Sequence, residues 1–272
     1  MENNILKAVL LAQIHGGILE VSEAVRIFGQ SGVGRFRSEY PNLCEIEGYL
    51  GRGDAEEQTR RAVISRNKIE RARCAVRCFR FIPWIRFVGV SGGVSYLNAK
   101  AADDIDLFMV VQNRRLWISR GLEALVLLIT GNRRMFGARN VRDKLCVNFY
   151  ITEAELTMAE DFLNALEIAN LRPVYNTEYI HYILDRNSWI HKYTPGLKSD
   201  TNVGSARRIP VISNILDLID YLAMQTQVLY MKLRGHLHSE IVLGKNVAKF
   251  FAANKWEQRR VQLEEALDSL RD

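Results

Sequence analysis

The segment from residue 88 to residue 111, VGVSGGVSYLNAKAADDIDLFMVV, constrains the fold of this chain more than any other. It contains two runs of β-branched and apolar residues, 88–90 and 105–111, bounded by turn-forming residues, a pattern typical of strands buried in a sheet. Gly92 and Gly93 lie between the runs and allow the backbone to turn tightly and to approach a ligand closely. The sequence therefore predicts a strand, a glycine turn and a second strand.

The second predicted strand opens with two carboxylates, Asp104 and Asp106. Because side chains alternate across a strand, both carboxylates should point to one face while Ile105 points to the other. Two carboxylates beside a glycine turn suit a hard divalent cation that carries nucleotide phosphates. We expect a binding site here.

The order of these residues resembles the signature of the polymerase-beta-type nucleotidyltransferase superfamily, because a Gly-Gly pair is followed, after ten residues, by Asp-Ile-Asp-Leu. The resemblance covers residues from about 82 to 152, and the whole arrangement also resembles a group of microbial proteins with such a domain in mid-chain. It implies that Ser91, Gly92 and Gly93 contact the triphosphate of an NTP substrate and that Asp104 and Asp106 bind Mg²⁺ or Mn²⁺. The acceptor hydroxyl stays open: a small molecule, a protein side chain or an RNA end.

The third predicted strand, 145–151, contains no acid. Members of the superfamily usually present a third carboxylate from this neighbouring strand, which ligates metal and often deprotonates the attacking hydroxyl. Asn148 matches that position, and its amide oxygen can touch magnesium but cannot accept a proton as a base. Two interpretations follow: an enzyme that uses water or substrate as its base, or a weak or inactive nucleotide-sensing regulator.

Composition bounds the other expectations. The chain has 272 residues, of which 48% are apolar and 25% charged, as in ordinary globular proteins of two or three domains. No apolar run is long enough for a membrane helix, and no signal-peptide pattern occurs. The four cysteines are not spaced as a disulfide framework, which fits a reducing compartment. We therefore expect a cytoplasmic protein without a membrane partner. A net charge of +6 would attract a polyphosphate or a nucleic acid, although arginine-rich, solvated helix faces explain it equally well.

The N-terminal residues 1–54 read as short helices at 4–14, 23–28 and 35–40, followed by a small hairpin up to residue 50. This order suggests a winged-helix-like domain, whose third helix and wing would meet nucleic acid through Arg35, Arg37 and Arg52. Three arginines are few for a DNA-binding surface, so docking of a protein partner is at least as good an interpretation.

The rest of the chain is predicted to be largely helical around the sheet. Residues 55–81 form a connecting helix with an apolar stripe, and Lys68 belongs to its solvated face. Arg114 and Arg115, before a helix at 116–128, are predicted to bind phosphate, because a helix N-terminus favours anions. Further helices are expected at 154–171, 177–193, 211–233 and 247–270.

The predicted fold is therefore α+β, with a nucleotidyltransferase-like mixed sheet flanked by helices. Its divisions are a winged-helix-like domain (1–54), the connecting helix (55–81), a nucleotidyltransferase-like domain (82–193) and a C-terminal helical region (194–272).

Overall fold

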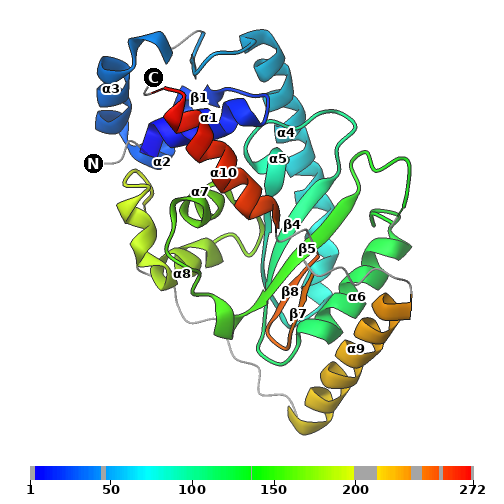
Figure 1. Ribbon diagram of the computed structural model, residues 1–272. Coiled ribbons are helices and arrows are strands. Elements are labelled where there is room, and N and C mark those ends of the chain that lie inside the picture. Colours follow the sequence, from blue (N-terminus) through cyan, green and yellow to red (C-terminus); the bar gives the residue numbers. More distant parts are fainter. Residues whose placement is uncertain are drawn as a thin grey trace.

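A computed structural model describes residues 4–43, 47–135, 137–198, 213–233, 241–250 and 254–270. Within these residues the chain forms a mixed sheet flanked by helices (Figure 1), as the sequence predicts. None of the described helices is both long and apolar enough to cross a membrane.

The sheet has six strands among the described residues, in the spatial order β6, β3, β4, β5, β8, β7. Their bounds are β3 (Ile85–Val90), β4 (Ile105–Val111), β5 (Leu145–Thr152), β6 (Arg172–Tyr175), β7 (Val242–Leu243) and β8 (Val247–Lys249). Among the six described strands, β4 and β5 form the one parallel pair, and helix α6 (Leu116–Ile129) lies in the crossover that such a pair requires. The parallel pairing places the first residues of β4 beside the first residues of β5.

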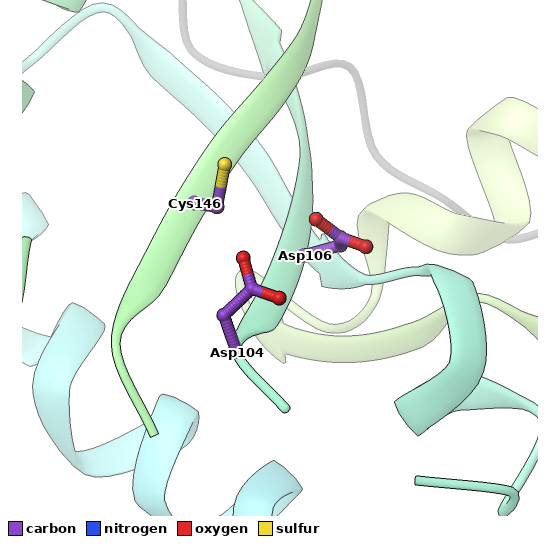
Figure 2. A group of neighbouring side chains, drawn as sticks. All are labelled: Asp104, Asp106 and Cys146. Carbon is purple, nitrogen blue, oxygen red and sulfur yellow. The ribbon is translucent and has the colours of Figure 1, made fainter. Parts of the chain in front are cut away.

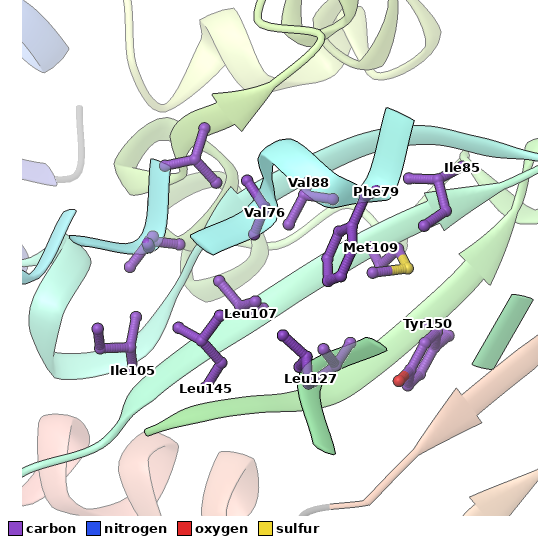
Figure 3. Packing of buried hydrophobic residues seen from close by; sticks show 14 of the residues in the cluster. Val76, Phe79, Ile85, Val88, Ile105, Leu107, Met109, Leu127, Leu145 and Tyr150 are labelled. Atoms are coloured by element: carbon purple, nitrogen blue, oxygen red, sulfur yellow. The ribbon is translucent and has the colours of Figure 1, made fainter. Parts of the chain in front are cut away.

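One face of the sheet is covered by α4 (Ala55–Ala75), by the 3₁₀ helix η2 (Val76–Phe81) and by α6. The apolar stripe predicted for the connecting helix is buried there, against Ile105, Leu107 and Met109 of β4 (Figure 3). Because full burial of one such side chain contributes roughly 1.5–3 kcal/mol, this core fixes which residues of β4 face away from it. Asp106 is one of them.

The opposite face carries Phe108 and Val110 and is covered by α7 (Phe162–Asn170), α8 (Tyr179–Arg186) and the 3₁₀ helix η4 (Ser188–Lys192). The long helices predicted at 154–171 and 177–193 are wrong in extent. The first is divided between the 3₁₀ helix η3 (Glu153–Glu155) and α7, which begins where Asp161 caps the backbone N–H of Asn164. The second is interrupted at Asn187, whose buried amide binds backbone groups of Leu156, Met158 and Ile183.

The N-terminal part comprises α1 (Asn4–Ile14), β1 (Leu19–Glu20), α2 (Val21–Phe28), α3 (Gln30–Glu39), the 3₁₀ helix η1 (Pro41–Leu43) and β2 (Tyr49–Leu50). β2 pairs with β1, while residues 44–46 of the predicted hairpin lie outside the described residues. These helices share one hydrophobic core with α7 and with α10 (Asn254–Asp268). The N-terminal helices are thus packed directly onto elements from the middle and end of the chain.

The C-terminal part is distributed over the molecule. α9 (Ser213–Leu233) packs beside α6, and α10 lies against α1 (Figure 1). The prediction of a helix from residue 247 is wrong, because Val247–Lys249 is β8 and pairs with β5. Strand β6 was not predicted. It contains Pro173 and lies at the edge of the described sheet, where proline is tolerated.

Candidate functional site

The two predicted carboxylates lie together at the beginning of β4. Asp104 immediately precedes the strand and Asp106 is its second residue, while Cys146 of β5 is the direct neighbour of Asp106 across the ladder. One ligand atom of each of these three residues lies within 4.8 Å of the other two. Figure 2 shows the carboxylates and the thiol side by side at the start of both strands.

The glycine turn reaches these carboxylates through Gly92. Ser91 follows β3, and Gly92 begins the four-residue helix α5 (Gly92–Ser95) with a φ of +63°. A Cβ atom at Gly92 would lie 2.7 Å from Oδ2 of Asp106, so the close approach requires a residue without a side chain. A Cβ at Gly93 would meet no atom within 4 Å. The need for a residue without a side chain therefore applies to Gly92 and not to Gly93.

Asn148 contacts the same carboxylate from β5. The register between β4 and β5 shifts at this point, since Leu107 pairs with Val147 but Phe108 pairs with Phe149, and Asn148 is the additional residue. Its Nδ2 donates a 2.7 Å hydrogen bond to Oδ1 of Asp106. A hydrogen bond to an ionised acceptor is stronger than a neutral one, so Asn148 fixes the orientation of the carboxylate.

Two further residues at the site were not singled out from the sequence. Nη1 of Arg134 forms an ion pair with Oδ2 of Asp104 at 2.9 Å and lies 3.6 Å from Sγ of Cys146. This oxygen of Asp104 is buried and accepts no hydrogen bond. Burial, followed by the charge of Asp106, raises the pKa of the Cys146 thiol to about 11, so the thiol is protonated at neutral pH. Cys146 could have been found because it lies two residues before Asn148, on the same strand face.

The turn that precedes the carboxylates is fixed by Lys68 of α4. Nζ of Lys68 donates to the carbonyl oxygens of Ala101 and Asp103, at 3.2 and 2.7 Å, and pairs with Oδ1 of Asp143 at 2.6 Å. The expectation that Lys68 is solvated is wrong, because its side chain is only 3% exposed. These acceptors satisfy the buried ammonium group and hold the backbone immediately before Asp104.

Arg114 and Arg115 do not reach the carboxylates. They follow the far end of β4, a strand of seven residues, and such a strand is about 20 Å long. Both arginines form ion pairs with Asp217 of α9. The adjacent N-terminus of α6 is already occupied, because Oδ1 of Asp220 accepts the backbone N–H groups of Trp117 and Ile118 at 2.9 Å. In this structure Arg114 and Arg115 fasten α9 to the start of α6, and the predicted phosphate contact stays a prediction.

Two cavities adjoin the glycine turn. The smaller, of about 150 Å³, is lined by Asp106, Asn148 and several apolar side chains. The larger, of about 370 Å³, extends between α1, α7 and the residues from Gly92 to Asp103. Gly92, Glu167 and Arg259 line both of them. The C-terminal helix α10 therefore contributes a side chain to the site, although it lies far from the turn in sequence.

The donor set fits a magnesium or manganese ion. Mg²⁺ is usually held by one or two carboxylates together with substrate phosphates. Asp104 and Asp106 supply such a pair. Oδ2 of Asp104 is ion-paired with Nη1 of Arg134 at 2.9 Å, so a bound ion would share this carboxylate with the guanidinium group. Sulfur is a soft ligand, which these hard ions bind poorly, so Cys146 would be a neighbour of the ion.

Comparison of the chain with protein-family models, with curated proteins and with solved structures finds no match. The interpretation of this site therefore depends on its own geometry and chemistry.

Proposed function

We propose that this chain is a cytoplasmic nucleotidyltransferase-like protein that moves a nucleoside monophosphate from an NTP to an acceptor hydroxyl with the help of Mg²⁺ or Mn²⁺. The observation that supports this most is the juxtaposition of three residues: Asp104 and Asp106 lie side by side, and the backbone of Gly92 lies against Asp106. Divalent cations that carry phosphates are bound by such carboxylate pairs, and a backbone without side chains admits the phosphates.

Each residue has a role that its position supports. Asp104 and Asp106 would hold the ion, which, when bound, neutralises charge on the phosphates. The backbone at Ser91, Gly92 and Gly93 would face the triphosphate. Asn148 would keep Asp106 oriented through its 2.7 Å hydrogen bond.

The transfer forms one bond and breaks one. The acceptor oxygen bonds to the α-phosphorus, the bond from that phosphorus to the bridging oxygen breaks, and pyrophosphate leaves with the electron pair. The described residues of β5 contain no carboxylate, and the amide of Asn148 cannot accept the hydroxyl proton. Without a base on β5, we propose that the proton passes to water or to a phosphate oxygen, and we expect slow turnover.

A second candidate function is a nucleotide-sensing regulator with little or no catalysis. The observation that favours it is the amide of Asn148 at the place where a third carboxylate is expected. The N-terminal order of helix, strand, two helices and strand suits a winged-helix-like unit, and Arg35 and Arg52 are exposed. Residues 1–54 would then bind nucleic acid or protein.

One experiment separates these functions. The pure protein is incubated with a panel of labelled NTPs, Mg²⁺ or Mn²⁺, and cell extract as a source of acceptors. Label transfer that is lost in the Asp104→Asn, Asp106→Asn double variant supports the enzyme, and metal-dependent nucleotide binding without transfer supports the regulator. If wild type and double variant bind the metal–nucleotide complex equally, the site is assigned wrongly in both proposals.

A further inference from the structure

The two cavities at the glycine turn differ in the charged side chains that line them. The larger one is lined by three cationic side chains, Arg61, Lys100 and Arg259, and by the two carboxylates Asp103 and Glu167. The smaller one is lined by Arg259 and by the two carboxylates Asp106 and Glu167. Of these cations, Arg61 is paired with Glu57 and Arg259 with Glu167, so the exposed Lys100 supplies the positive charge that would attract an anionic ligand to the larger cavity.

They also differ in size. About 370 Å³ falls within the range of roughly 300–1,000 Å³ that is usual for sites of cofactors and small molecules. About 150 Å³ is the size of the engineered cavity that binds benzene. Both cavities are lined mainly by apolar side chains, and those of the smaller cavity include Phe108, Phe149, Met158, Ile168 and Leu171.

From this difference we infer that the larger cavity holds the nucleotide and the smaller one holds the acceptor, whose hydroxyl is carried by an uncharged, apolar group about the size of one ring. This inference depends on the proposed transferase function and specifies its acceptor. The free 3′ end of an RNA is disfavoured, because a terminal nucleotide with its ribose and base is too large for a cavity of about 150 Å³. A phenol or a small cyclic alcohol satisfies the chemistry, whether it is a free molecule or the tyrosine side chain of a peptide.

Of the two carboxylates proposed to hold the ion, Asp106 lines the smaller cavity and Asp104 lines neither. Gly92 lines both cavities, and Asp106, which lies against it, lines the smaller one. A phosphate at the glycine turn and a hydroxyl in the smaller cavity would approach each other at Asp106. The ion pair of Glu167 with Arg259, at 2.8 Å, lies at the lining of both cavities and closes the site from the side of α7 and α10.

Two variants address one cavity each. Lys100→Met removes an exposed cation of the larger cavity, and the backbone N–H of Lys100 keeps its bond to Asp103. Met158→Trp fills the smaller cavity from a partly exposed position, where folding should tolerate it. Circular dichroism and the midpoint of thermal unfolding check that both variants are folded.

Binding of a nonhydrolysable, magnesium-loaded ATP analogue is measured by calorimetry, and binding of phenol and cyclohexanol by saturation-transfer NMR. Lys100→Met should weaken binding of the analogue about 5- to 10-fold, as expected for the loss of one charge-assisted contact, and leave phenol binding unchanged. Met158→Trp should leave binding of the analogue within about 2-fold, since it changes no charge, and abolish binding of phenol and cyclohexanol.

The opposite pattern, with the analogue blocked by Met158→Trp and unaffected by Lys100→Met, overturns the assignment of the cavities but leaves the proposed transferase function in place. Binding of the analogue that survives the Asp104→Asn, Asp106→Asn double variant overturns the function itself. Label transfer to phenol or to a tyrosine-containing peptide then identifies the source of the hydroxyl, whereas transfer to an RNA end alone overturns the inference.

Discussion

Replacing Gly92 with alanine should damage the candidate site, whereas the same change at Gly93 should not. The two residues are adjacent in α5, and each change adds one methyl group. At Gly92 the new Cβ would lie 2.7 Å from Oδ2 of Asp106, and the residue has a φ of +63°. At Gly93 the new Cβ would meet nothing within 4 Å. Comparing the Gly92→Ala and Gly93→Ala variants therefore tests whether the backbone of the turn lies against the carboxylate of Asp106.

The loss at Gly92 has two sources. A residue with a side chain in the left-handed region costs about 1–2 kcal/mol. Asp106 must also move away from the new methyl group, which strains its 2.7 Å hydrogen bond with Asn148, and a hydrogen bond to a charged group contributes about 1.5–3 kcal/mol. Because the turn can relax in part, we expect the free energy of unfolding to fall by about 2–4 kcal/mol. Gly93→Ala should change it by less than about 1 kcal/mol, and in the stabilising direction, because alanine favours helix.

Urea denaturation of both variants measures these free energies, and calorimetry with Mn²⁺ and a nonhydrolysable NTP measures the site. Gly92→Ala should lose stability and binding together, with Gly93→Ala close to wild type in both. Equal stability and equal binding in the two variants would refute the proposed contact between the turn and Asp106.

The remaining predictions concern groups around the site and the sheet. Lys68→Met should lower the free energy of unfolding by about 3–5 kcal/mol, because it leaves Asp143 and two carbonyl groups without their buried partner; urea denaturation checks this, and a loss below about 1 kcal/mol contradicts it. Burial raises the pKa of Glu123, which accepts a hydrogen bond from Tyr150, to about 7. In the unfolded chain the carboxyl group of Glu123 is ionised above a pH of about 4.5, whereas in the folded chain it stays protonated up to a pH of about 7. The free energy of unfolding therefore falls by a total of about 3 kcal/mol as the pH rises from about 4.5 to 7. Glu123→Gln should remove this part of the pH dependence, and parallel stability profiles of wild type and variant from pH 4 to 8 would argue against it. Asp220→Ala should lower the free energy of unfolding by about 1 kcal/mol, because it removes the N-terminal cap of α6. Asp220→Asn should keep most of the stability, because the asparagine oxygen can still cap the helix. Equal losses of the two variants in thermal unfolding would show that the cap is not responsible.

The elements with strong local patterns could be predicted from the sequence. The bounds of β4 were predicted correctly at both ends, because a run of apolar residues lies between an acidic start and a turn. The proximity of Asp104 to Asp106 followed from alternation along the strand. The buried stripe of the connecting helix followed from its helical spacing.

What the sequence could not predict depends on contacts between distant segments. Arg134 reaches Asp104 from a loop whose position is set by its backbone bond to Leu145, and no local pattern records that bond. Lys68 resembles its solvated neighbours on the helix but meets three acceptors brought from elsewhere. Val247–Lys249 lies in a strand because β5 offers it an open edge, which is a tertiary preference that overrides helical composition.

The central claim, that Asp104 and Asp106 hold a divalent cation beside the glycine turn, is tested most directly by electron paramagnetic resonance of Mn²⁺. Free Mn²⁺ is titrated with wild type, with Asp106→Asn and with Asp106→Asn, Asp104→Asn, each with and without a nonhydrolysable NTP. We predict that wild type binds Mn²⁺ more tightly when the nucleotide is present, and that each lost carboxylate weakens this binding by at least about 10-fold, equivalent to about 1.4 kcal/mol. Mn²⁺ binding that is the same in wild type and in the double variant would contradict the claim.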